Sequence, residues 1–199
     1  EHALDADIQI GGLSLGVSRQ GPMVYLNDLA ITHHGESEPA ITADRAGLAF
    51  SLLDLISGQY VPDGIRLDGP KLAVTIQNGR PGLAHWPRGN SALTLERLTA
   101  FRRYLGELIV DDGQLTVIAP QLPGGRAQWQ SLDVNIAENA PDVLEASLSA
   151  DGPDWWSAVA ANARLSGDLA PTAQARFHLS ATGLRPAQPW PDLIHDTKR

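Results

Sequence analysis

The stretch from Leu48 to Ile76 reads LAFSLLDLISGQYVPDGIRLDGPKLAVTI and predicts a short helix followed by an interrupted strand. Apolar residues at helical spacing run from Ser51 to Ile56, and the turn sequence Pro62-Asp63-Gly64 follows. Apolar and polar residues then alternate from Ile65 onward, with a break at Asp68-Gly69-Pro70. Because alternation puts every second side chain on the same side of a strand, we expect this part to have one apolar face.

A weaker copy of this stretch follows from Leu93 to Ile118, LTLERLTAFRRYLGELIVDDGQLTVI. The apolar positions of its strand part match those of the first copy at a constant offset of 43 residues: Leu67 with Val110, Leu72 with Leu115 and Val74 with Val117. Leu95 and Leu98 match helical leucines of the first copy at the same offset, which predicts a second short helix. The recurrence indicates two weak repeats, about 24–76 and 93–118 onward.

Length and composition limit the possible classes. With 199 residues and 43% hydrophobic content, the chain can form one core or one extended sheet, so we expect a single unit over residues 1–183. Residues 184–199 are rich in proline, which predicts an irregular tail. The net charge of −8 argues against a nucleic-acid partner, since phosphate binding needs clustered Lys and Arg. The lack of Cys excludes disulfides, thiolate metal sites and Cys nucleophiles.

Alternating apolar and polar residues predict further strands in both halves of the chain. These are Leu4–Arg19 with a break at Gly11-Gly12, Met23–Thr32, Ile41–Phe50, Gln128–Ile136, Val143–Ala150 and Ala173–Ala181. Gln128–Ile136 and Val143–Ala150 are predicted to form a hairpin. Trp156–Asp168 is compatible with a helix or a strand, and Asn78–Asn90, rich in Gly and Pro, is predicted to be turn throughout.

In several of these strands the apolar alternation shifts by one residue. The shifts fall at Asn27-Asp28, Asp68-Gly69-Pro70 and Asp111-Asp112-Gly113. A kinked strand or a tight hairpin would each produce such a shift, because Gly with positive φ suits both. We expect kinked strands, since a flat sheet has to bend in order to enclose anything.

The sequence therefore predicts a mainly β protein with two short helices, in which each strand has one dry and one wet face, as in an antiparallel sheet covered on one side. Twelve residues on the dry faces form the candidate binding surface: Leu72, Val74, Ile76, Leu115, Val117, Leu132, Val134, Ile136, Leu144, Leu148, Phe177 and Leu179. A continuous apolar face of this kind would accept acyl chains. The alternative is that these residues pack on the helices and on one another.

Val24 to Leu83 resembles the AsmA-like family of bacterial envelope proteins. The matching motifs are YLNDLAI at Tyr25–Ile31, FSLLDLISGQY at Phe50–Tyr60 and IRLDGPKLAVTIQNG at Ile65–Gly79. The later segments YLGELIVDDGQLTVIAP and WQSLDVNIAE are similar to the next unit of the YhdP-like members. The loop Asn78–Asn90 departs from the family pattern, because Pro-Gly follows Arg80 where the family has an extended arginine-led turn.

This resemblance implies a long, twisted antiparallel sheet curled into a groove. It also implies a periplasmic segment, anchored in the inner membrane by a part of the protein before Glu1, that carries phospholipid toward the outer membrane. The twelve apolar residues would then contact the acyl chains. A different class of function is a structural or adaptor module that binds other envelope proteins through open sheet edges.

Other candidate sites are weaker. His33-His34 with Glu36 and Glu38 are potential metal ligands, but adjacent residues of an extended chain point to opposite faces, so we expect a solvated turn and no metal or other cofactor. Asp68 and Asp111-Asp112 sit beside Gly, which favours turn chemistry over a catalytic carboxylate pair.

Two aromatic pairs and the catalytic motifs complete the search. His85-Trp86 is expected to anchor its loop, and Trp155-Trp156 is either an interfacial anchor or a pair at the edge of the core. The sequence contains no G-x-S-x-G, no H-E-x-x-H and no phosphate-binding glycine loop, so we do not expect an enzyme.

Overall fold

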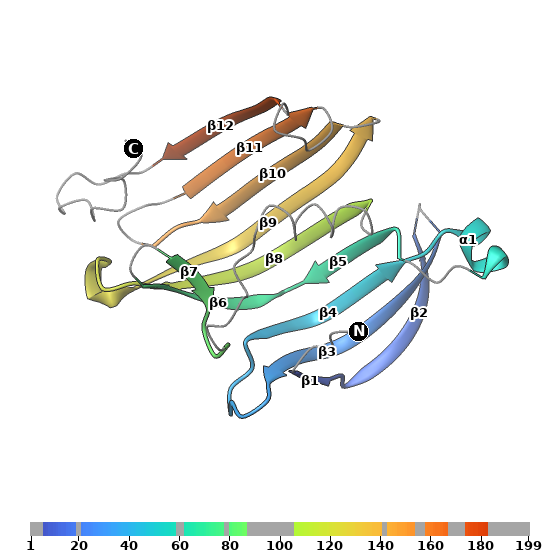
Figure 1. Cartoon of the computed structure of the whole chain (residues 1–199), viewed down its shortest axis with the longest axis horizontal. Helices are drawn as coiled ribbons and strands as arrows, with labels where there is room; N and C mark the ends of the chain where they lie inside the picture. The colour runs from blue at the N-terminus through green and yellow to red at the C-terminus, as the bar shows by residue number, and fades with distance from the viewer. Residues whose placement is uncertain are drawn as a thin grey trace.

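The computed structural model describes residues 6–18, 21–58, 62–77, 80–86, 106–140, 143–153, 158–166 and 174–182. These residues form one mixed sheet of twelve strands, with one short α-helix and one 3-10 turn (Figure 1). The second predicted helix, the pair Trp155-Trp156 and the predicted tail at 184–199 lie outside the described residues.

The elements follow one another along the chain in this order: β1 Ala6–Gln9, β2 Gly12–Ser18, β3 Gly21–His33, β4 Ile41–Ala49, α1 Leu52–Ser57, β5 Gly64–Asp68, β6 Lys71–Gln77, β7 Arg80–Leu83, β8 Glu107–Ile118, the 3-10 turn Pro123–Gly125, β9 Arg126–Ala140, β10 Val143–Asp151, β11 Ala158–Ser166 and β12 Gln174–Thr182. Within the sheet, the spatial order is β1, β3, β4, β5, β8, β9, β10, β11 and β12. β2 also pairs with β3, and β6 pairs with β4, β7 and β8.

The two sequence repeats lie side by side in the sheet. β5 and β6 pair with β8 in parallel, and the register joins Leu67 to Val110 and Leu72 to Leu115, the same residues that the 43-residue offset matches. The expectation of an antiparallel sheet is therefore wrong at this junction, and the sheet is mixed. Parallel neighbours need a long crossover, and the residues between β7 and β8 supply one.

Most predicted elements are confirmed. α1 forms within the predicted helical stretch, β9 and β10 form the predicted hairpin, and β12 forms close to its expected bounds. The ambiguous segment at 156–168 contains β11. The expectation that Asn78–Asn90 is turn throughout is wrong, because Arg80–Leu83 is β7 and pairs with β6. Pro81 is tolerated there since β7 pairs with β6 alone among the described strands.

A single residue has left-handed backbone at each of three predicted shifts and at one further position, Ser131. Asp28 in β3, Asp112 in β8 and Ser131 in β9 have φ of 52°, 52° and 47°, and Gly69, between β5 and β6, has φ of 60°. These four residues are called the kink line here. Three of them are neighbours, since Gly69 N donates to Asp111 O at 2.9 Å and Asp112 N donates to an Asp133 carboxylate oxygen at 3.1 Å. Asp28 lies on β3, which β4 separates from β5. The expectation of kinked strands is thus confirmed at Asp28 and Asp112, which lie within β3 and β8, whereas Gly69 separates β5 from β6. The kink at Ser131 was not predicted.

The core of this sheet is made of small residues. Among the described residues, the buried hydrophobic positions are two larger side chains, Met23 and Leu122, and otherwise alanines: Ala40, Ala43, Ala46, Ala49, Ala84, Ala119, Ala127 and Ala150. No large side chain in the described part of the chain is fully buried. In a single sheet, each side chain is covered by its neighbours within the sheet but by no second layer. The larger apolar side chains of the described residues therefore stay half-buried or exposed.

Replacing Gly69 by Ala tests the kink line. A Cβ there would be strained at φ of 60° and would meet the carboxylate of Asp44. We expect Gly69→Ala to lower the free energy of unfolding by about 1–3 kcal/mol in urea denaturation. Gly82→Ala is the matched control, because no atom lies within 4 Å of its Cβ position. Equal stability of the two variants would contradict a structural role for the kink.

Candidate functional site: the apolar face of the sheet

The kinks keep the apolar side chains of each strand on one side of the sheet. Val110 and Gly113 are separated by Asp111 and Asp112. In a regular strand, residues three positions apart point to opposite faces. The Cβ position of Gly113 nevertheless lies 3.1 Å from Val110 Cγ1 and 3.3 Å from Pro70 Cγ. The left-handed backbone of Asp112 therefore shifts the alternation by one residue, and the apolar side chains after it point to the same face as those before it.

Strand pairing extends this face sideways, because directly paired residues point to the same side. Val110 of β8 pairs with Val134 of β9, and Val134 pairs with Leu148 of β10. In the opposite direction, Leu115 of β8 pairs with Leu72 of β6. We call this side of the sheet the apolar face.

The strand register assigns all twelve predicted residues to the apolar face. Ten of them have described side chains, and each of the ten is half-buried: Leu72, Val74, Ile76, Leu115, Val117, Leu132, Val134, Ile136, Leu144 and Leu148. For Phe177 and Leu179 the structure gives the backbone register, in which they pair with Ala163 and Ala161 of β11. Positions from five different strands, β6, β8, β9, β10 and β12, are thus brought together.

The same face continues into the N-terminal strands, which the list of candidate residues omitted. Leu48 of β4 pairs with both Val24 of β3 and Ile65 of β5, and Ile65 pairs with Leu108 of β8. Beyond β3, Leu15 of β2 pairs with Val24. The sequence shows the apolar alternation of these strands on both sides of each shift. Only the parallel pairing of β5 with β8 shows that their apolar side chains belong to the same face as those of β8 to β10.

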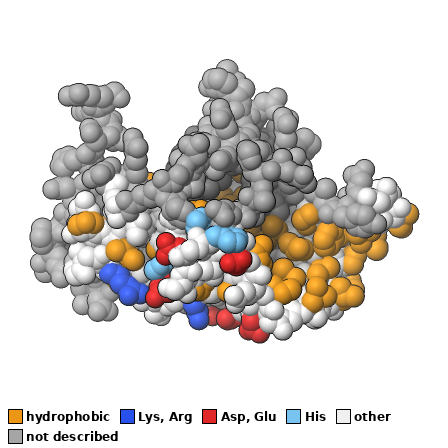
Figure 2. Space-filling view, turned by 60° about the horizontal axis from the view of Figure 1, so that its bottom comes forward, with side chains coloured by type: hydrophobic (Ala, Val, Ile, Leu, Met, Phe, Trp, Pro, Cys, Tyr) orange, Lys and Arg blue, Asp and Glu red, His pale blue; other side chains and the backbone are white. Residues whose placement is uncertain are grey.

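The outer part of the apolar face is strongly exposed. On β2, Leu13, Leu15 and Val17 are 61%, 78% and 85% exposed. Leu53 and Ile56 of α1 are 78% and 83% exposed. Figure 2 shows hydrophobic side chains gathered on the right of the view, the side on which β2 and α1 lie in Figure 1.

One end of the apolar face is closed by the chain itself. The turn before β9 places buried Leu122 beside Ala119 and Ala127, and Ile76, Val117 and Trp129 pack against this cluster. Two of the twelve predicted residues, Ile76 and Val117, therefore contact the protein's own core. They form the end of the face rather than its open part.

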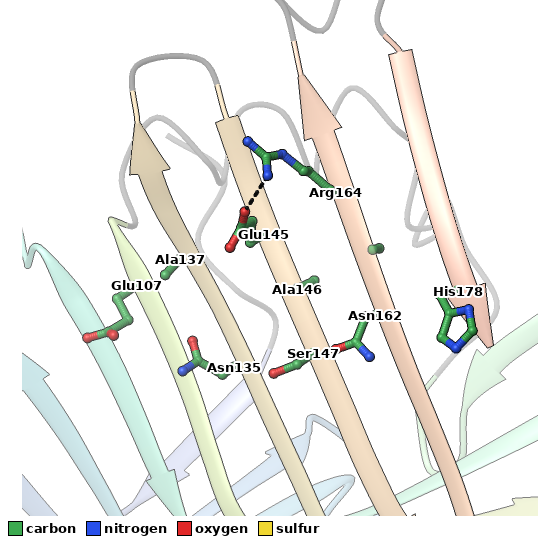
Figure 3. A pocket seen from close by; sticks show the side chains of 10 residues that line it. Glu107, Asn135, Ala137, Glu145, Ala146, Ser147, Asn162, Arg164 and His178 are labelled. Carbon is green, nitrogen blue, oxygen red and sulfur yellow. Dashed lines mark ion pairs between the residues drawn. The ribbon is translucent and has the colours of Figure 1, made fainter. Parts of the chain in front are cut away.

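The opposite side, called the polar face here, holds a hollow of about 500 Å³ over β8 to β12. A row of polar side chains crosses it from Asn135 through Ser147 and Asn162 to His178, one on each of four paired strands (Figure 3). Hydrogen-bonding groups on this side and aliphatic groups on the other make the sheet amphipathic across its thickness.

One ion pair lies at the edge of the hollow. Arg164 Nη1 lies 3.2 Å from Glu145 Oε1, on the neighbouring strand, as the dashed line in Figure 3 marks. Both side chains are well exposed, so this pair adds little to the free energy of folding.

The carboxylates beside the kink line are paired with arginines. Arg45 Nε donates to Asp68 Oδ2 at 2.6 Å and Arg66 Nε donates to Asp68 Oδ1 at 3.0 Å. Arg66 Nη2 also lies 2.7 Å from Asp111 Oδ2. Burial alone would raise the pKa of Asp68, but the hydrogen bonds and charges of Arg66 and Arg45 outweigh it and lower that pKa. The hydrogen bond to Asp68 in turn raises the pKa of Arg66.

These contacts revise the turn interpretation of the aspartates. Asp112 does adopt turn-like backbone at φ of 52°, whereas Asp68 and Asp111 lie in β5 and β8 and pair in register. Two adjacent carboxylates with two arginines form a charge-balanced network on the polar face. The contact of Arg66 with Asp111 joins β5 to β8 and therefore stabilises the parallel pairing of these two strands.

Three of the described histidines, His33, His34 and His85, lie near the turns at one end of the sheet. His34 Nε2 is 3.4 Å from Asp7 Oδ1, and His85 Nε2 is 3.2 Å from Glu38 Oε2. The ring of His33 packs edge-on against Trp86 with centroids 5.1 Å apart. His85 and Trp86 thus tie the turn after β7 to the turn between β3 and β4. Within the described ranges, no three His, Asp or Glu side chains are grouped so as to hold a metal ion.

Comparison with known proteins gives no relative. No family model, curated protein or solved structure matches the chain. In the part of the chain that the structure describes, no helix has the length and apolar character needed to span a membrane.

Replacing Asp68 by Asn tests the arginine network. Because its folded-state pKa is lowered, Asp68 stabilises the fold above its ordinary pKa of about 3.9, and this contribution is lost as pH falls through the lowered value. Both arginine side chains are more than 40% exposed, so we expect Asp68→Asn to cost about 1 kcal/mol at pH 7 and close to nothing at pH 2. Urea denaturation at the two pH values measures this.

The control for that experiment is Asp151→Asn, at the exposed end of β10. We expect this change to leave the unfolding free energy unaltered at pH 7. A loss for Asp68→Asn that is the same at both pH values would contradict the electrostatic explanation.

Proposed function

We propose that the chain is a periplasmic segment of an inner-membrane-anchored protein, and that its apolar face carries phospholipid acyl chains toward the outer membrane. The observation that carries this proposal is the state of the large apolar side chains. They gather on one face of a single sheet and stay half-buried or exposed, while the described core is built mainly of alanine.

The described elements leave this face without a second layer. All twelve described strands belong to one sheet, and α1 lies beyond the end of β4 (Figure 1). An apolar area of this extent that the described elements leave uncovered is typical of a binding surface. Acyl chains are a suitable occupant, because each buried methylene contributes about 0.8 kcal/mol without any directional contact.

The dimensions of the sheet suit such a cargo. Nine strands in sequence across the sheet, at a spacing of about 4.8 Å, give an apolar face roughly 40 Å wide. One leaflet of a membrane has acyl chains of about 15 Å, so the face accommodates lipid tails over several neighbouring strands.

A groove is the shape that would shield lipid from water. We propose that the sheet curls around its apolar face, because strands twist and left-handed residues bend β3 and the adjacent strands β8 and β9. The polar face, with its arginine network and the row from Asn135 to His178, would then face the aqueous surroundings. The resemblance to the AsmA-like family supports the same arrangement.

The alternative function is that of an adaptor that recruits envelope proteins through an open sheet edge. The observation that favours it is β2, whose apolar side chains are exposed and which pairs with β3 alone among the described strands. An adaptor would need no lipid on the central part of the face, so lipid binding separates the two functions.

Lipid binding is tested by incubating the purified chain with vesicles of phosphatidylethanolamine and phosphatidylglycerol. The protein is then re-isolated and its bound phospholipid is measured by phosphate analysis and mass spectrometry. We expect phospholipid in at least equimolar amount. A re-isolated protein that is folded and free of phospholipid would contradict the carrier function and favour the adaptor.

Two neighbouring residues on β9 provide matched variants for this assay. Val134→Lys puts a charge in the middle of the apolar face, and Asn135→Lys puts the same charge on the exposed polar face. We expect the first to reduce bound phospholipid at least fivefold and the second to leave it unchanged. Val134→Thr, of similar volume, serves as the second variant if Val134→Lys does not fold, and an intermediate loss is then expected.

A further inference from the structure

β2 is an edge strand without the usual protection against pairing. Among the described strands it pairs with β3 alone, and its residues 12–18, GLSLGVS, contain no charged side chain and no proline. Exposed edges in soluble proteins usually carry Lys, Pro or a bulge that prevents another strand from adding. β12, at the other edge, carries Arg176 and His178 in its sequence. The β2 edge is therefore the one suited to strand addition.

The exposed side chains of β2 lack one neighbouring strand. Leu15 is 78% exposed, whereas its partner Val24 on β3, which has strands on both sides, is half-buried. Both residues belong to the apolar face, and the difference follows from the position of β2 at the edge of the described strands. A strand added beside β2 would bring Leu13, Leu15 and Val17 to the same degree of burial as the interior strands.

We propose that β2 pairs antiparallel with β2 of a second copy of this chain, with Leu15 on the two-fold axis. The sequence around Leu15 has the same character in both directions. In this register Leu13 lies opposite Val17, Ser14 lies opposite Gly16 and Leu15 lies opposite itself. Each apolar residue meets an apolar residue and each small residue meets a small one, which is the self-complementarity that a two-fold interface requires.

The symmetry keeps the apolar faces of both copies on one side. A two-fold axis perpendicular to the sheet maps each face onto itself, so the two sheets join into one with a continuous apolar face. The net charge of −8 on each chain opposes association, but β2 itself contributes no charge to the contact. This inference concerns the edge of the sheet and stands whether or not the face binds lipid.

Sedimentation velocity over a range of concentrations tests the dimer. We expect the purified chain to form a reversible dimer, favoured by added salt because salt screens the net charge. Leu15→Lys, which sets two ammonium groups against each other, is expected to weaken association at least tenfold. Leu53→Lys on α1 is the matched control, since Leu53 is also 78% exposed but does not lie on β2, and it should leave association unchanged.

A chain that stays monomeric at every concentration would overturn the proposal. Equal weakening by Leu15→Lys and Leu53→Lys would also overturn it, because the association would then be unspecific adhesion of apolar surface. Both substitutions are at highly exposed positions, so we expect both variants to fold.

Disulfide trapping tests the register, because the chain contains no Cys and an introduced thiol is the only one present. Under mild oxidation, Leu15→Cys should form a covalent dimer with itself, while Leu53→Cys should not. A mixture of Leu13→Cys and Val17→Cys should give a mixed dimer in preference to either homodimer, since opposed residues alone come within disulfide distance. Preferential linkage of Leu13→Cys with itself would contradict this register.

Discussion

The alternation of side chains along a strand is the constraint on which this structure depends. A strand that is regular throughout sends every second residue to the same face, and a shift of one residue in the pattern would reverse that face. Asp28, Gly69, Asp112 and Ser131 each adopt left-handed backbone at such a shift. One left-handed residue per strand restores the phase, so apolar residues before and after the kink stay on one side. The amphipathic character of β3, β8 and β9 depends on these backbone angles, whereas no left-handed residue is described in β10, β11 and β12.

Much of the fold could be predicted from local sequence patterns. The strands around Val134 and Leu148 follow from strict alternation, and the kinks at Asp28, Gly69 and Asp112 follow from Asp and Gly at the shifts. The kink at Ser131 was not predicted. The parallel pairing of β8 with β5 and β6 could not be predicted from alternation, because the relative direction of two strands depends on the path of the chain that connects them. Its register was nevertheless present as the 43-residue offset, since repeats that pair in parallel keep equivalent residues opposite each other. The ion pairs of Arg66 depend on that junction, so strand patterns alone did not indicate them.

The candidate surface was predicted in its central part and missed at both ends. Ile76 and Val117 were included, although the turn that carries Leu122 packs on them, and only the three-dimensional path of that turn reveals the contact. Leu15 was omitted because the sequence of β2 does not indicate whether another strand lies beside it. A single-layer sheet has apolar surface that its own described elements do not cover, and acyl chains over the middle and a second β2 at the edge would cover it in different ways.

The most direct measurement is the quenching of a fluorophore by spin-labelled phospholipid. The label is attached to Cys introduced at Leu148 on the apolar face or at Ser149, the next residue of β10 on the polar face, in a chain that has no other thiol. If acyl chains lie on the apolar face, phospholipid with a nitroxide on its acyl chain quenches the label at position 148 strongly and the label at position 149 weakly. Equal quenching at the two positions, or none at either, would contradict the account.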